Sequence, residues 1–127
     1  MRNLLKLTIT LLLCSTALAA TKAQAVSIYD GIYSTNPNIG YVYFREQQGQ
    51  MIAVLNQTFG APYWSAGQGA LNGASVSLTT IIGYTRGVND VVFTSDSTFQ
   101  ATQTSCVPNG LLCAFPNGTT FTGTKIW

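Results

Sequence analysis

Short runs of β-branched and aromatic residues, separated by Gly, Asn and Pro, make up the chain after residue 25. Such runs are typical of β-strands, because branched and aromatic side chains suit a pleated, half-buried surface. Several runs alternate between apolar and polar positions, as in Val76-Ser77-Leu78, and a strand sends alternate side chains to opposite faces. The pattern predicts eight strands: Ser27–Ser34, Tyr41–Gln47, Met51–Thr58, Tyr63–Gly69, Ala74–Ile82, Val91–Ser95, Phe99–Ser105 and Thr119–Trp127.

The segments between these strands are rich in residues that favour chain reversal, among them Asn36-Pro37-Asn38, Asn72-Gly73 and the longer segment Gly83–Asp90. Consecutive short strands at regular spacing predict an all-β antiparallel meander, which either closes as a barrel or folds as a sandwich. We expect a closed barrel. Sequential hairpins need only local pairing, and closure removes the edges that a weakly charged protein cannot otherwise protect.

The first 25 residues have the three parts of a secretory signal peptide. A short basic start precedes an apolar run too brief to span a bilayer, and Ala23-Gln24-Ala25 forms a small-x-small cleavage site. We expect cleavage after Ala25, with Ala17-Leu18-Ala19 as the alternative site and a buried N-terminal helix as the structural alternative. Residues 26–127 then form a single all-β domain that is periplasmic or secreted.

Removal of the signal peptide also changes the charge of the protein. The formal net charge of +2 becomes −1, because three of the six basic residues lie in the first 25 residues and all four acidic residues follow them. A nearly neutral surface lacks the Lys and Arg contacts that nucleic-acid binding and polybasic membrane attachment need. Most predicted strands are also shorter than the roughly 9 to 11 residues of a membrane-spanning strand. We expect neither a nucleic-acid partner nor stable membrane insertion.

Two cysteines remain after cleavage, Cys106 and Cys113. Cys14 leaves with the signal peptide, and a lipid anchor there is disfavoured because the preceding Leu13 is not small. In an oxidising compartment we expect a disulfide between Cys106 and Cys113, which would stabilise the fold by roughly 2 to 3 kcal/mol. The alternative, a redox or metal-binding pair, needs closer spacing or further ligands, and the chain has no His.

Groups that could carry out catalysis are few. A Ser-His-Asp triad cannot form without His, and a carboxylate pair for glycoside hydrolysis would have to come from Asp30, Glu46, Asp90 and Asp96. Asp90 and Asp96 occupy turn-like positions, where Asp commonly bonds its own backbone. The spacing of Asn89, Asp90 and Asp96 matches no compact calcium loop. We therefore predict a protein that is not an enzyme and that has no cofactor and no metal.

Three stretches of the first half of residues 26–127 resemble a β-rich module of exported proteins from Gram-negative bacteria. They are the segment Gly31–Tyr41, with Asn36-Pro37 and Gly40, then Gly49–Leu55, then Gly60-Ala61-Pro62-Tyr63-Trp64. The module has Gly, an aromatic residue, Asn-Pro and Gly before a strand, and later Gly-x-Pro-x-Trp; this chain has Tyr33 where the module commonly has Trp. The module has no established activity. The resemblance therefore implies an exported β-module and no catalytic function.

Aromatic residues interleaved with Asn, Gln, Ser and Thr are the remaining feature with chemical potential. Flat aromatic faces beside neutral hydrogen-bonding groups can hold a sugar ring or a small organic molecule, and the mouth of a β-barrel is a common place for such a site. Taken singly, each of these aromatic residues is better explained as an ordinary strand or core residue whose polar end is in water. The candidates for ligand binding are Tyr63, Trp64, Tyr41 and Tyr43.

Three functions fit these observations. The first is an exported, non-enzymatic binding module for a glycan or a small neutral ligand. The second is a structural or self-assembling surface protein that associates through strand edges and forms oligomers. The third is a secreted effector or inhibitor that meets a protein partner through exposed loops, including one with Leu111, Leu112 and Phe115. We favour the first, because it uses the aromatic and amide side chains.

Overall fold

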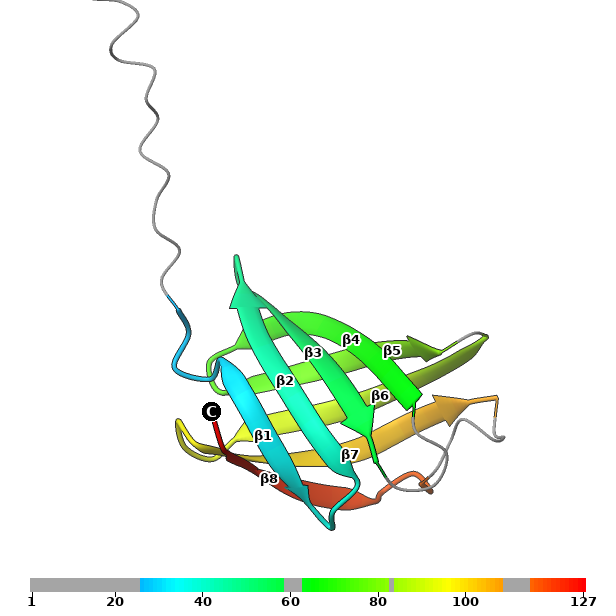
Figure 1. Ribbon diagram of the computed structural model, residues 1–127. Helices are drawn as coiled ribbons and strands as arrows, with labels where there is room; N and C mark the ends of the chain where they lie inside the picture. The colour runs from blue at the N-terminus through cyan, green and yellow to red at the C-terminus, as the bar shows by residue number, and fades with distance from the viewer. Residues whose placement is uncertain (1–25, 59–62, 83, 109–114) are drawn as a thin grey trace, which may run out of the picture.

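Eight β-strands follow one another along the chain, and each is antiparallel to the next (Figure 1). The structure is a computed structural model that describes residues 26–58, 63–82, 84–108 and 115–127, without the side chains of Tyr63 and Ile82. The strands are β1 (Gly31–Asn36), β2 (Gly40–Gln47), β3 (Gln50–Gln57), β4 (Tyr63–Asn72), β5 (Ser75–Ile82), β6 (Thr85–Phe93), β7 (Thr98–Val107) and β8 (Thr120–Lys125).

The first and last strands pair with each other and close the sheet into a barrel. The β1–β8 pairing runs from Tyr33 opposite Lys125 to Asn36 opposite Thr122, so every described strand has a hydrogen-bonded neighbour on both sides. The prediction of an all-β antiparallel meander of about eight strands, closed as a barrel and not folded as a sandwich, is confirmed. The predicted signal peptide, residues 1–25, lies outside the described residues and stays a prediction.

One predicted connection is wrong. We expected residues 83–90 to join two strands, but β6 begins at Thr85 and its pairing with β5 extends from Ile82 opposite Thr85 to Ser77 opposite Asp90. Gly and Asn have weak strand preferences, and cross-strand pairing with β5 and β7 outweighs them here. Consequently Gly87 and its neighbours belong to the barrel wall, where they face the interior or solvent in alternation.

The predicted alternation of side chains sets which residues fill the barrel. In β2, Val42 and Phe44 are buried inside, whereas Tyr41 and Tyr43 point outward. Val76 and Leu78 of β5 face inward in the same way. The interior is therefore lined by every second residue of each strand, as barrel geometry requires.

One half of the interior is filled by aromatic rings. Tyr33, Phe44, Phe93 and Phe99 meet edge to face, with ring centroids 5.1 to 5.4 Å apart for the closest pairs. Tyr29, just before β1, stacks on Phe93 at 4.3 Å and covers them. This half, which we call the packed end, lies where the chain turns between β2 and β3, β4 and β5, and β6 and β7. Such contacts add roughly 0.5 to 1.5 kcal/mol each beyond their apolar burial.

Polar groups seal the packed end. The buried Asp30 carboxylate accepts a hydrogen bond from the Glu46 backbone N–H at 2.6 Å and lies 3.1 Å from an Arg45 guanidinium nitrogen. The Tyr33 hydroxyl donates to the Tyr29 carbonyl at 2.9 Å. Burial is the main cause that raises the pKa of Tyr33 to about 12, and the negative charges of Asp30 and Asp96 raise it further.

The raised pKa of Tyr33 makes stability depend on alkaline pH. The stabilisation is complete below the pKa of the unfolded chain, about 10, and is lost as the pH rises towards about 12, because the unfolded chain releases the proton first. We expect the free energy of unfolding to fall by on the order of 2 kcal/mol over this interval, measured by urea denaturation.

The variant Tyr33→Phe tests whether Tyr33 causes the loss of stability at alkaline pH. It keeps the ring but loses the hydrogen bond to Tyr29, so we expect about 1 kcal/mol less stability at neutral pH and a shallower alkaline decline. The difference between the alkaline declines of the two proteins measures the contribution of Tyr33. An equally steep decline in the variant would show that Tyr33 is not its cause.

Candidate functional site

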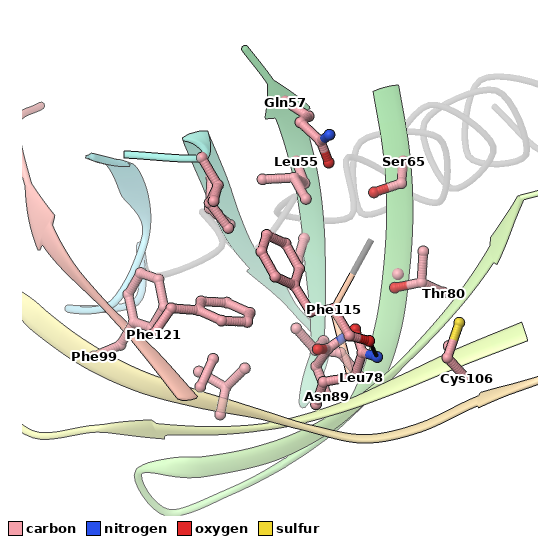
Figure 2. A pocket seen from close by; sticks show the side chains of 18 of the residues that line it. Leu55, Gln57, Ser65, Leu78, Thr80, Asn89, Phe99, Cys106, Phe115 and Phe121 are labelled. Carbon is pink, nitrogen blue, oxygen red and sulfur yellow. Dashed lines mark hydrogen bonds between the residues drawn. The ribbon is translucent and has the colours of Figure 1, made fainter. Parts of the chain in front are cut away.

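A cavity occupies the other half of the barrel interior, and we call this half the cavity end. Its volume is about 110 Å³, and it lies on the side where the chain connects β1 to β2, β3 to β4, β5 to β6 and β7 to β8 (Figure 2). The cavity extends down to Phe44 and Phe99 of the packed end. Its walls are mainly strands and not long loops, so its shape is built into the hydrogen-bonded barrel.

The cavity exists because the inward-facing residues along one cross-strand row are small. In register across β3 to β7 this row reads Ala53, Gly67, Thr80, Gly87 and Cys106. Two of these five residues have no side chain, and they flank Thr80 on both sides. An eight-stranded barrel has an interior just wide enough to be filled by side chains or to hold one small ligand. Where the side chains are this small, space remains.

Neutral polar side chains form one wall of the cavity. Four of them come from three adjacent strands: Ser65 from β4, Thr80 from β5, and Thr85 and Asn89 from β6. Gln57 of β3 and Gln103 of β7 extend this polar lining on either side. Figure 2 shows the hydroxyl oxygens of Ser65 and Thr80 pointing into the cavity. Among the described residues, none of these four side chains forms a hydrogen bond that would explain a purely structural role. Their polar groups are available to a molecule inside.

Apolar side chains form the opposite wall. Val42 of β2 and Phe121 of β8 line it, with Phe115 from the segment before β8; in the closed barrel β2 and β8 lie across from β6 and β4. Phe115 and Phe121 lie with ring centroids 6.4 Å apart. The Gln103 side chain donates a hydrogen bond to the Phe115 carbonyl at 2.5 Å and so holds this segment against the barrel. The cavity therefore has an apolar side and a polar side.

The cavity wall carries no formal charge among its described residues. Asp30 and Glu46 lie at the packed end, Asp90 points outward from β6, and Asp96 lies in the turn between β6 and β7. In the described ranges, His, Cys, Asp and Glu side chains form no group of three that could hold a metal ion. The arrangement can hold a neutral molecule by shape and hydrogen bonds, and it brings no acid and base together.

Three of the four aromatic residues predicted to bind a ligand have side chains that lie elsewhere. Tyr41, Tyr43 and Trp64 are on the outer wall, where Trp64 is 68% exposed, and none of them lines the cavity. The backbone of Tyr63 pairs with Gln57, and its side chain lies outside the described part. The register places Asn56 between Tyr41 and Trp64, so these three side chains form one row across β2, β3 and β4. The structure thus brings Tyr41 and Trp64 into one row, on the outside of the barrel.

The predicted disulfide concerns the cavity as well. A bulge at Thr104 shifts the alternation of β7, and as a result Cys106 is buried and lines the cavity beside Gly87. Cys113 lies outside the described residues, so the bridge stays a prediction. If it forms, it ties the connection between β7 and β8 to the cavity wall.

Sequence reasoning missed the polar wall of the cavity. The signal was present in β5, where the inward positions Val76 and Leu78 are followed by Thr80 at the same spacing. In β4 the corresponding inward positions are Ser65 and Gly67. A change from large apolar to small polar residues along one strand face marks the place where a barrel interior stops being filled.

No match is found when the chain is compared with protein-family models, with curated proteins and with solved structures. The resemblance to an exported Gram-negative module therefore stays a prediction. Within the part of the chain that the structure describes, no helix is long and apolar enough to cross a membrane. The function is inferred below from the cavity and its residues.

Two glycines of the cavity wall test its geometry. A Cβ added at Gly87 would have Ser105 O, at 3.9 Å, as its nearest neighbour, whereas a Cβ at Gly67 would lie 2.6 Å from the Thr80 hydroxyl oxygen. We expect Gly87→Val to raise the free energy of unfolding by about 0.5 to 1 kcal/mol, because it fills space and removes a flexible strand residue. Gly67→Val should lower it by about 1 to 3 kcal/mol through overpacking. Urea denaturation of both variants measures the difference, and equal destabilisation by the two would contradict an open cavity beside Gly87.

Proposed function

We propose that the protein is an exported, non-enzymatic binding module that holds a small neutral ligand in the cavity end of the barrel. The observation that carries the proposal is an interior cavity without described charges, in which an apolar wall faces four neutral polar side chains. Ligand sites in proteins typically combine an apolar lining with a few convergent polar groups. The proposal rests on the Ser65, Thr80, Thr85 and Asn89 side chains and on the space beside Gly87.

The volume supports a ligand of about one ring. The cavity holds about 110 Å³, somewhat less than the roughly 150 Å³ of an engineered apolar cavity that binds benzene. Pockets for drug-sized molecules occupy roughly 300 to 1,000 Å³. An oligosaccharide does not fit such a space, so of the two ligand classes expected from the sequence, the small neutral molecule suits the cavity better.

The absence of charge from the described cavity wall supports a neutral ligand. A carboxylate or ammonium group buried without an opposite charge loses its hydration, at a cost of several kcal/mol. Hydroxyl and amide groups can replace the hydration of a neutral ligand at far lower cost. Neutral molecules should therefore bind in preference to charged molecules of the same size.

The alternative functions have less support. All described strands are paired on both sides, so edge-to-edge pairing, the route by which a β-protein would self-assemble, finds no open strand among them. The inhibitor hypothesis expects an exposed loop with Leu111, Leu112 and Phe115. Phe115 instead lines the cavity, and Leu111 and Leu112 lie outside the described residues. Export through the predicted signal peptide would place the barrel in the periplasm or outside the cell.

Nuclear magnetic resonance with one-ring probes tests the proposal. We expect phenol to shift the methyl signals of Leu55 and Leu78 with a dissociation constant on the order of 0.1 to 1 mM, and benzoate and benzylammonium to leave them unchanged. Gly87→Val should weaken phenol binding by roughly tenfold or more, because its side chain occupies the same space.

Ala70→Val is the matched control, since Ala70 is exposed on the outer face of β4 and the substitution adds apolar bulk outside the barrel. It should bind phenol as the unmodified protein does. Binding of all three probes alike, or undiminished binding by Gly87→Val, would rule out the cavity as a site for neutral ligands.

A second candidate function concerns the outer wall. Tyr41 and Trp64 are 45% and 68% exposed and flank Asn56 in register, so two aromatic side chains stand about 10 Å apart with an amide between them. This row suits a neutral glycan, whose ring faces pack on aromatic side chains while its hydroxyls bond amides. Trp64 would contribute the largest flat surface.

Titration with a neutral β-glucan oligosaccharide tests the outer row. We expect calorimetry to detect binding of the oligosaccharide, and we expect Trp64→Ala to weaken this binding by roughly tenfold or more. Trp127→Ala removes the other tryptophan, which is 86% exposed and lies outside the row, and should leave the affinity unchanged. Equal effects of the two substitutions would remove the support for a glycan site at this row.

A further inference from the structure

The polar side chains of the cavity wall lie on consecutive strands from β3 to β7, while the described lining residues of β2 and β8 are apolar, and this asymmetry indicates how a ligand would lie in it. Ser65, Thr80, Thr85 and Asn89 all come from β4, β5 and β6, while Val42 and Phe121 come from β2 and β8 across the barrel. Figure 2 shows the two hydroxyl groups of Ser65 and Thr80 on the side opposite the rings of Phe99 and Phe121. A ligand that matches both walls has one polar edge and one apolar face.

Polar side chains inside a barrel normally have a structural task, and two others in this interior do. The Thr35 hydroxyl bonds the backbone at Ile39 and Gly40, and the Gln103 amide bonds the Phe115 carbonyl. The four polar side chains of the cavity wall have no comparable bond among the described residues. Buried polar groups require a hydrogen-bonding partner. A molecule in the cavity, either water or a ligand that replaces it, would supply such a partner to the buried Ser65 and Thr85 and to the half-buried Thr80 and Asn89.

Thr80 is at the centre of this polar wall. Its neighbours in register are Gly67 on β4 and Gly87 on β6, so no side chain stands beside it in either direction. Thr85 and Asn89 lie two residues on either side of Gly87 and face the same interior. The hydroxyl of Thr80 is thus covered by no side chain of its register partners on β4 and β6.

We propose that the ligand is a neutral one-ring molecule with a hydroxyl or amide group on one edge, and that this edge faces Thr80 and Thr85 while the ring lies against Val42 and Phe121. This inference rests on the proposed binding function and adds the chemical class and the orientation of the ligand. Hydroxyl and amide edges both donate and accept hydrogen bonds, as do the side chains of Ser, Thr and Asn.

Phenol and toluene form a suitable pair of probes, because they have nearly the same size and toluene has a methyl group where phenol has its hydroxyl group. A site built around hydrogen bonds rejects an analogue that lacks them, since its own polar groups then remain unpaired. We expect phenol to bind the full mature protein roughly tenfold or more tightly than toluene, measured by the same methyl resonance shifts.

Thr80→Val and its neighbour Thr79→Val separate the cavity from the outer wall. The substitution is similar in size at both positions and suits a strand, but Thr80 faces the cavity and Thr79 faces outward. We expect Thr80→Val to reduce the preference for phenol over toluene severalfold, and Thr85→Val to do the same. Thr79→Val should leave the preference intact. Urea denaturation confirms that each variant is folded.

The outcomes distinguish this inference from the function on which it rests. Equal binding of phenol and toluene by the unmodified protein would overturn the polar-edge inference and leave a cavity for neutral ligands in place. A preference for phenol that survives both Thr80→Val and Thr85→Val would likewise overturn it. Failure of both probes to bind would overturn the proposed function together with the inference.

Discussion

Closure of the sheet is the constraint on which the rest of this structure depends. Once β1 pairs with β8, the barrel has a fixed circumference, and the enclosed space must be filled by side chains or left open. At the packed end, the rings of Tyr33, Phe44, Phe93 and Phe99 fill it. At the cavity end, the row from Ala53 through Gly67 and Gly87 cannot fill it, because these residues are too small. The cavity is a consequence of sequence within a fixed circumference.

The same closure affects how the proposed site would work. A cavity whose walls are paired strands changes shape little, so ligand binding would require little ordering of the protein. Close packing at the packed end adds to this rigidity. The Phe99 ring packs so closely against Gly123 that a Cβ at Gly123 would overlap the ring. Stability is therefore concentrated at one end of the barrel, while the other end combines small and polar residues that favour binding over packing.

Local residue preferences predicted the fold well and the site poorly, for a physical reason. β-branched runs and reversal residues identify strands and turns, and a consecutive meander follows from their order. Which face of each strand points inward depends on register, and register is set by neighbours. The aromatic character of Tyr41, Tyr43 and Trp64 indicated chemistry, but alternation places them outside. Gly87 and Asn89 looked like turn residues, and only their pairing with β5 makes them cavity residues.

Alternation also explains how one short sequence can present two separate surfaces. Ser65 faces the cavity while the adjacent Trp64 is exposed outside, and Thr80 and Thr79 divide in the same way. A shift of one residue would exchange the two faces, so the register must be maintained around the whole barrel. The bulge at Thr104 is the place where it changes, and there the change brings Cys106 inward next to Gly87. The inner polar wall and the outer aromatic row can therefore be altered independently by substitutions at adjacent positions, which separates the contributions of the two surfaces to ligand binding.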